Sequence, residues 1–169
     1  MSVQESRRAK LEALVHRGIQ PYAYRFDVTH RSSEIRAHHA ELSASSEPVR
    51  FAGRLMTKRP HGKAAFAHVK DRDGLMQVYF REDVLGPEAF ADAMDFDLGD
   101  WVGIQGIVFT TRTGEITVRC ERVELLAKSL RPLPEKWHGL TDVEIRYRQR
   151  YTDLIVNDEV REVFQARAR

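Results

Sequence analysis

The chain has 169 residues, of which 42% are hydrophobic and 31% are charged, as is ordinary for a globular protein. No apolar run approaches the roughly 20 residues that a membrane-spanning helix needs. The first residues have no continuous apolar stretch after their charges, so we predict no secretory signal. Cys120 is the only cysteine, which excludes an internal disulfide framework and a cysteine-based zinc site. A single cysteine fits a reducing cytosol, so we expect a cytoplasmic protein.

The formal net charge is only +2, but charges of opposite sign are segregated along the chain. Residues 47–81 carry a net charge of +5, whereas residues 82–100 carry −7 and have no Lys or Arg. Either each charged run is a solvated face, or the basic stretch faces a polyanion and the acidic stretch stays away from it. The basic residues are Arg50, Arg54, Lys58, Arg59, Lys63, Lys70, Arg72 and Arg81.

Two helices are predicted before residue 49. The first covers residues 4–17, because Leu11, Leu14 and Val15 fall on one face and Gly18 follows where a left-handed cap is favoured. This helix is basic, so it either touches a nucleic-acid backbone or forms a solvated face. The second helix begins near Ser33 and has apolar residues at helical spacing up to residue 42.

Five strands are predicted between residues 49 and 126, with one helix between the third and the fourth. The strands cover residues 49–56, 64–70, 75–80, 101–110 and 115–126, and the helix runs from Pro87 to about residue 94. A turn is predicted over residues 58–62, and the alternation slips after Cys120, which predicts a bulge near Glu121. The order is that of the OB barrel, a mainly β fold that binds oligonucleotides on one face. We therefore expect a five-stranded OB barrel with flanking helices.

The alternation within each strand predicts an exposed face suited to single-stranded nucleic acid. In residues 64–70, Ala65 and Ala67 take the inward positions, which turns Phe66 and His68 outward. An exposed ring can stack a base, while polar groups read base edges and cations hold phosphates. The alternative is that the alternation is inverted and Phe66 lies in the core. The residues expected on this face are Arg54, Arg59, Phe66, His68, Gln77, Tyr79, Glu115, Thr117 and Arg119.

The sequence shows no pattern of a catalytic or metal site. None of the seven histidines has a second His, Cys or acid at ligand spacing on one helix face. Gly103 and Gly106 lie inside a strand pattern, which indicates bends and not a phosphate-binding loop. Cys120 takes an inward position and is expected to be a buried structural thiol. The residues alone therefore predict a nucleic-acid-binding module.

Four segments resemble the N-terminal region of bacterial-type lysyl-tRNA synthetases, which belong to the second synthetase class. They read GRLMTKRPHGKAAF, TRTGEI, LRPLPEKWHGLTD and RYRQRYTDL. The last two are the most specific, because the related aspartyl and asparaginyl enzymes share the barrel but usually lack the arginine-rich run. The resemblance covers essentially the whole chain.

This resemblance implies an OB domain that binds the tRNA anticodon and a catalytic domain that ligates lysine to tRNA with ATP and Mg²⁺. The family pattern departs at Ala65 and, more strongly, at Pro60-His61. The resemblance places the anticodon-binding residues at Arg59, Phe66, Gln77 and Glu115. Strand alternation adds further expected nucleic-acid contacts at Arg54, His68, Tyr79 and Arg119.

The resemblance also suggests how the chain is divided. We expect a helical extension at residues 1–46, the OB domain at 47–127, a linker at 128–156, and the start of the first catalytic motif helix at 157–169. The motifs that hold ATP are missing from the sequence, so this chain is expected to bind tRNA(Lys) without catalysis and without its own cofactor or metal. The parent ligase is expected to be a homodimer. A free-standing OB module that binds single-stranded nucleic acid, or a truncated product without activity, are the alternatives.

Overall fold

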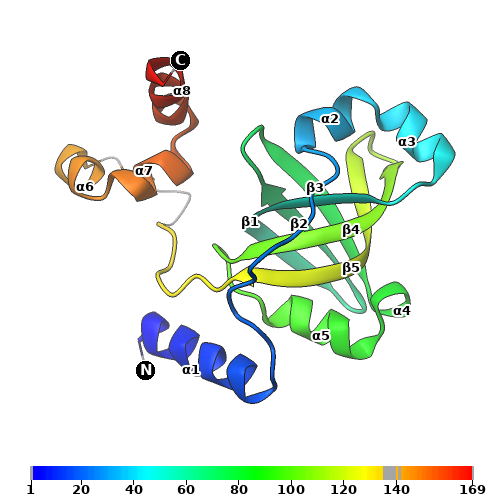
Figure 1. Ribbon diagram of the computed structural model, residues 1–169, viewed down its shortest axis with the longest axis horizontal. Coiled ribbons are helices and arrows are strands. Elements are labelled where there is room, and N and C mark those ends of the chain that lie inside the picture. The colour runs from blue at the N-terminus through cyan, green and yellow to red at the C-terminus, as the bar shows by residue number, and fades with distance from the viewer. Residues whose placement is uncertain (1, 135–139, 141, 169) are drawn as a thin grey trace. The chain divides into compact units, whose positions relative to one another are not determined.

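The computed structural model describes residues 2–134, 140 and 142–168 (Figure 1). Its contacts divide the chain into two compact units, Met1–Arg131 and Pro132–Arg169. The predicted linker falls in part on residues 135–139 and 141, which lie outside the described residues. In the first unit, five strands close into a barrel in the order β1-β2-β3-β5-β4. The predicted five-stranded barrel is therefore confirmed.

Alternating apolar residues fill the interior of the barrel. Its strands are β1 (Val49–His61), β2 (Ala64–Lys70), β3 (Leu75–Arg81), β4 (Trp101–Thr110) and β5 (Ile116–Ala127). Neighbouring strands pair antiparallel, except for β3 and β5, which pair parallel. The largest fully buried side chains include Phe51, Phe80 and Leu55. Because successive side chains of a strand point to opposite faces, this inward set leaves a second set on the outer surface.

Strand β1 is longer than the sequence pattern predicted. The turn expected over residues 58–62 is shorter, since β1 continues through Pro60 to His61 and pairs with β2 as far as Ala64. Strand β4 pairs with β1 only from Val49 to Arg54, so the far end of β1 has an open edge on that side. Proline is tolerated on such an edge because its missing N–H removes no ladder hydrogen bond.

Three register shifts interrupt the strand pairing, one of them between Trp101 and Val102 in the pairing of β4 with β5. The pairing of β4 with β5 shifts between Gln105 and Gly106, so that Glu121 has no partner, which confirms the predicted bulge. The third shift, in the pairing of β1 with β2, leaves out Met56. Gly106 is required at the first bulge because an added Cβ would lie 2.0 Å from the Arg119 carbonyl oxygen.

Short helices cover the barrel. Helix α5 (Pro87–Asp95) lies between β3 and β4 as predicted, and α4 (Glu82–Leu85) precedes it. The helix predicted from about residue 33 is in fact two, α2 (Ser32–Ala37) and α3 (His39–Ser45). Each is held by a different part of the barrel. Asp71, after β2, accepts hydrogen bonds from the Ser32 amide and hydroxyl, whereas the Ser43 hydroxyl donates to the Val108 carbonyl on β4.

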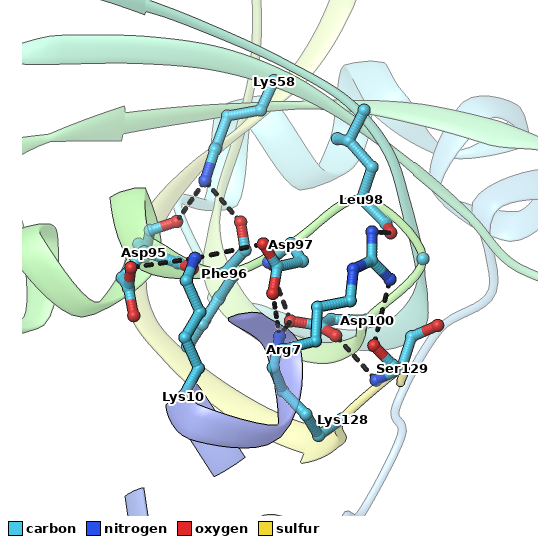
Figure 2. Close-up of polar contacts among 12 residues, drawn as sticks. Arg7, Lys10, Lys58, Asp95, Phe96, Asp97, Leu98, Asp100, Lys128 and Ser129 are labelled. Atoms are coloured by element: carbon cyan, nitrogen blue, oxygen red, sulfur yellow. Dashed lines mark hydrogen bonds and ion pairs between the residues drawn. The ribbon is translucent and has the colours of Figure 1, made fainter. Parts of the chain in front are cut away.

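The N-terminal helix, α1 (Val3–His16), packs differently from the expectation. Its start is stabilised by a capping box, and Gly18 follows with a φ of 73°, as predicted. However, Val15 is 57% exposed, whereas Arg7 is buried. The Arg7 guanidinium donates to the carbonyl oxygens of Leu98 and Ser129 (Figure 2). It also donates to the carbonyl oxygen of Arg131. Leu14 is buried as the predicted apolar face implies, and Arg7 is a second, polar anchor of the helix.

The basic residues of α1 pair with the acidic stretch that follows β3. Arg17 forms two hydrogen bonds to the Asp92 carboxylate, at 2.7 and 3.0 Å. Lys10 lies 3.0 Å from both Asp95 and Asp97. The two oppositely charged segments therefore neutralise each other, and the acidic run is more than a solvated face.

A buried ion cluster joins this stretch to the end of β5 (Figure 2). Lys128 forms ion pairs with Asp97 and with Asp100, which is fully buried. Lys58, expected on the polyanion-facing surface, instead donates to three carbonyl oxygens at the end of α5, those of Ala93, Met94 and Phe96. A lysine in this place caps the C-terminus of the helix, where the dipole favours a positive charge.

The second unit contains α6 (Val143–Arg148), α7 (Arg150–Val156) and α8 (Asp158–Arg167). Asp153 is fully buried and accepts hydrogen bonds from Arg146, Arg150 and Asn157. Asn157 takes the N-cap position of α8, at the start of the helix expected over residues 157–169, although its side chain bonds to Asp153 and not to α8. Within the described residues, no helix is long and apolar enough to cross a membrane.

Candidate nucleic-acid interface

The strand register brings the predicted residues into two rows on the outer surface of the barrel. Residues that pair directly across neighbouring strands point to the same face of a sheet. The first row runs Arg59, Phe66, Tyr79 and Arg119 across β1, β2, β3 and β5. The second row runs Thr57, His68, Gln77 and Thr117 across the same strands.

Aromatic rings dominate the first row. The rings of Phe66 and Tyr79 stack with centroids 4.5 Å apart and planes inclined by 19°. Phe109, on β4, lies 6.3 Å from Tyr79 and extends the aromatic surface. Phe66 is nevertheless 38% exposed, while Ala65 and Ala67 are fully buried. The structure thus confirms that Phe66 faces outward and excludes the inverted alternation.

A continuous set of hydrogen bonds links the second row. The Thr57 hydroxyl lies 2.9 Å from His68 Nδ1, and His68 Nε2 lies 3.3 Å from Glu115 Oε1. Gln77 Nε2 donates to Glu115 Oε2 at 2.9 Å. The Thr117 hydroxyl donates to Gln77 Oε1 at 2.7 Å. Both oxygens of Glu115 and both ends of the Gln77 amide are therefore held in place.

The network defines which groups remain for a ligand. Gln77 Oε1 accepts from Thr117 and one amide N–H donates to Glu115, which leaves the second N–H as a donor. The Glu115 side chain is 49% exposed, and each carboxylate oxygen can accept more than one hydrogen bond. Gln77 and Glu115 thus place a donor beside an acceptor, close to the stacked rings.

The structure locates the remaining predicted residues around these rows. Arg59 is exposed at the end of β1, directly opposite Phe66. Arg119 is exposed next to Tyr79 and lies 3.8 Å from Glu121. Arg54 lies in the next outward row, opposite Lys70, where it donates to the Gly99 carbonyl and stacks on the Trp101 ring at 5.2 Å. Its polar end is therefore directed toward β4 and away from the Phe66 ring.

Two residues of this face were missed, and one is covered. Thr117 projects to the outer side of β5 as expected, but it is fully buried and bonded to the Gln77 side chain. Simple alternation along β1 would turn Thr57 inward. The bulge at Met56 turns it outward instead, so that it can join the network. Phe109 lies on β4 and contacts the ring of Tyr79. Its outward position could have been predicted from the alternation of that strand.

The described residues show no cluster of three His, Cys, Asp or Glu side chains that could hold a metal ion. Cys120 is fully buried, and its burial raises the pKa of the thiol, so the thiolate is strongly disfavoured. Stacking and hydrogen bonding are the chemistry that this surface offers. Both suit the recognition of unpaired bases.

Comparison with known proteins agrees with this geometry. Residues 49–126 match the family model of the tRNA anti-codon type, described as an OB-fold nucleic acid binding domain. The barrel is thus similar to this family along all five of its strands. The matched range coincides with the barrel, since it begins at the first residue of β1 and ends one residue before the last of β5. It therefore contains both rows of outward residues.

The chain is also similar to lysine–tRNA ligases over almost its whole length. It is 53% identical to that of Pelotomaculum thermopropionicum over 163 residues, which are 96% of this chain and 32% of the relative. The ligase of Carboxydothermus hydrogenoformans is 53% identical with similar coverage, and that of Enterococcus faecalis 50%. The resemblance to lysyl-tRNA synthetases is thus confirmed. The chain spans about a third of the length of these relatives.

Proposed function

We propose that this OB-fold domain binds the anticodon loop of tRNA(Lys), with Arg59, Phe66, Gln77 and Glu115 as its principal contacts. Phe66 stacks on a base of the loop, Gln77 and Glu115 bind a base edge, and Arg59 binds a phosphate. His68, Tyr79 and Arg119 support these contacts from the same two rows, and Arg54 lies at their margin.

The observation that carries this proposal is the exposed ring of Phe66 beside an ordered donor and acceptor. The Phe66 ring packs on Tyr79 but is still 38% exposed, and an exposed aromatic ring provides a stacking surface for an unpaired base. The hydrogen bonds that hold Gln77 and Glu115 remove the need to order these side chains on binding. A preformed site of this kind binds at a lower entropic cost.

The activity of a whole ligase is a further part of the proposal. The relatives are lysine–tRNA ligases, about a third of whose length this chain spans. We propose that this domain delivers tRNA to a catalytic part that joins lysine to it with ATP and Mg²⁺, in a homodimeric cytoplasmic enzyme. No described residue of this chain is assigned to ATP or Mg²⁺, and the chain by itself is expected to bind tRNA without ligating it.

Replacement of Phe66 tests the site. We expect Phe66→Ala to weaken binding of an RNA hairpin with the lysine anticodon loop by about 1–3 kcal/mol, because one base loses its stacking partner. Fluorescence anisotropy of the labelled hairpin measures the affinity, and circular dichroism checks the fold. Tyr24→Ala is the matched control, since Tyr24 is an aromatic residue that is 97% exposed outside the two rows. Unchanged affinity of a folded Phe66→Ala variant would exclude this assignment.

The same assay separates anticodon recognition from general single-strand binding. A recognition domain prefers the hairpin with the lysine anticodon to one with a scrambled loop, whereas a free-standing OB module binds both equally. Binding should weaken as salt rises in either case, because the RNA backbone releases counterions. The preference between the two loops, and not the salt dependence, therefore decides between the two functions.

A further inference from the structure

His68 lies between two partners that occupy both of its ring nitrogens. Nδ1 is 2.9 Å from the Thr57 hydroxyl, and Nε2 is 3.3 Å from the Glu115 carboxylate. In the neutral ring with the proton on Nε2, Nε2 donates to Glu115 and Nδ1 accepts from Thr57. In the protonated ring, Nε2 still donates to Glu115. Neither nitrogen is left to read a base, so a direct contact to RNA does not account for this residue.

Glu115 is the residue that these contacts fix. Its backbone is held by Thr111, whose hydroxyl accepts from the Glu115 amide at 3.0 Å and whose amide donates to the Glu115 carbonyl at 2.9 Å. Its carboxylate receives one donor from β2, His68, and one from β3, Gln77. Donors from two neighbouring strands therefore orient the Glu115 carboxylate.

We propose that His68 is a positioning residue that sets the base selectivity of Glu115; this inference rests on the proposed function. An ionised carboxylate accepts a hydrogen bond but cannot donate one. With the Gln77 N–H beside it, the pair binds a base edge that carries an N–H next to a carbonyl. Uracil and guanine present such an edge, whereas the corresponding ring nitrogen of cytosine and adenine is an acceptor and faces Glu115 unfavourably.

Two substitutions separate the two contacts of the histidine. The amide nitrogen of His68→Gln can reach the place of Nε2 and donate to Glu115. The amide of His68→Asn reaches only the place of Nδ1, near Thr57. The full chain is titrated with oligouridylate and with oligocytidylate of equal length, and the ratio of the two affinities is recorded. We expect His68→Gln to keep the preference for uridine and His68→Asn to lose about tenfold of it, because the hydrogen bond to a charged carboxylate is removed.

A double-substitution cycle tests whether His68 acts through Glu115. Glu115→Gln alone should reduce the preference, since an amide no longer offers two acceptors. Adding His68→Asn to Glu115→Gln should then change the ratio no further, because residues of one network are not additive. His16→Asn serves as the control, since His16 lies on α1 outside the two rows. A purely structural histidine would instead change both affinities equally and leave their ratio intact.

The outcomes distinguish this inference from the proposed function. If Phe66→Ala weakens RNA binding but His68→Asn keeps the full uridine preference, the positioning role is wrong and the interface stands. Additive effects of His68→Asn and Glu115→Gln would also overturn the positioning role. If the unmodified chain binds neither oligonucleotide, the proposed function fails and this inference fails with it.

Discussion

Asp97 is the residue at which α1, the acidic stretch and the end of β5 meet. Its carboxylate lies 3.0 Å from Lys10 and is also paired with Lys128, while its amide donates to Asp100 at 2.8 Å. Burial by itself would raise the pKa of Asp97, but the hydrogen bonds and positive charges of Lys128 and Lys10 lower it overall. The folded protein therefore favours the ionised form of this side chain.

This shift predicts how stability responds to acid. A carboxyl group whose pKa is lower in the folded protein stabilises it at pH values above its ordinary pKa of 3.8, and that contribution is lost as pH falls through the lowered value. Asp97→Asn should therefore have a lower free energy of unfolding than the unmodified chain at pH 7. The gap between the two free energies should become smaller below about pH 4. Urea unfolding between pH 7 and pH 3 measures this.

Asp27→Asn is the control for the acid experiment. Asp27 also forms an ion pair, with Arg25, but its side chain is 59% exposed, so its removal should change stability little at any pH. If the difference between the unmodified chain and Asp97→Asn stayed constant from pH 7 to pH 3, the linkage of Asp97 to folding would be refuted.

Single residues of the interface were predictable where strand alternation governs them. Phe66 was placed correctly because Ala65 and Ala67 fit the crowded interior, and a phenylalanine between them must then face outward. The burial of Thr117 was not predicted, because alternation gives the side of a strand on which a residue lies but not what covers it. The contact of His68 with Thr57 depends on a bulge at Met56, and no local pattern in β1 marks that position.

At the scale of elements, α1 is held by a buried arginine. Arg7 donates to the carbonyl oxygens of Leu98, Ser129 and Arg131 at 2.9 to 3.1 Å. Two of these carbonyls belong to the segment through which the chain leaves β5. The helix therefore fixes the course of the chain after the barrel as well as the loop before β4.

Arg7→Met tests this arrangement. Methionine preserves the length and much of the apolar stem, but it removes the Arg7 donor from three carbonyl oxygens, of which that of Arg131 still accepts from the Ser129 hydroxyl. We expect a loss of roughly 2–4 kcal/mol in the free energy of unfolding. Urea denaturation followed by circular dichroism measures the loss. Arg8→Met is the matched control, because Arg8 is the exposed neighbour on the same helix. Equal unfolding midpoints for the two variants would show that Arg7 does not anchor the helix.

Element boundaries were predictable to the extent that local signals mark them. Pro87 and Gly18 marked a helix start and a helix end, since their backbone preferences act within one turn. Pro60 misled the prediction because it suggested a turn, whereas the open edge of β1 accepts it within a strand. The burial of Arg7 could not be foreseen, since its partners are about 90 or more residues away in the sequence.

At the scale of the whole molecule, the proposed interface belongs entirely to the first unit. All eight predicted contact residues lie between Arg54 and Arg119, within the unit Met1–Arg131. The arginine-rich run of the second unit is engaged internally. Arg146 and Arg150 are paired with the buried Asp153, and Arg148 lies 2.7 Å from Glu144. Arg146 and Arg150 are therefore committed to Asp153 and are poorly placed to hold RNA phosphates.

A chain ending at residue 134 should therefore bind the anticodon hairpin with nearly the affinity of the full chain, within about threefold, and with the same salt dependence. It retains the Arg131 carbonyl that Arg7 requires. Anisotropy titrations at several salt concentrations compare the two chains. If the second unit also held RNA phosphates, its removal would lower the slope of log K against log salt by roughly 0.7 to 0.9 for each phosphate. A lower slope with an unchanged preference for the lysine anticodon would show that the second unit holds the RNA backbone while the barrel alone selects the sequence.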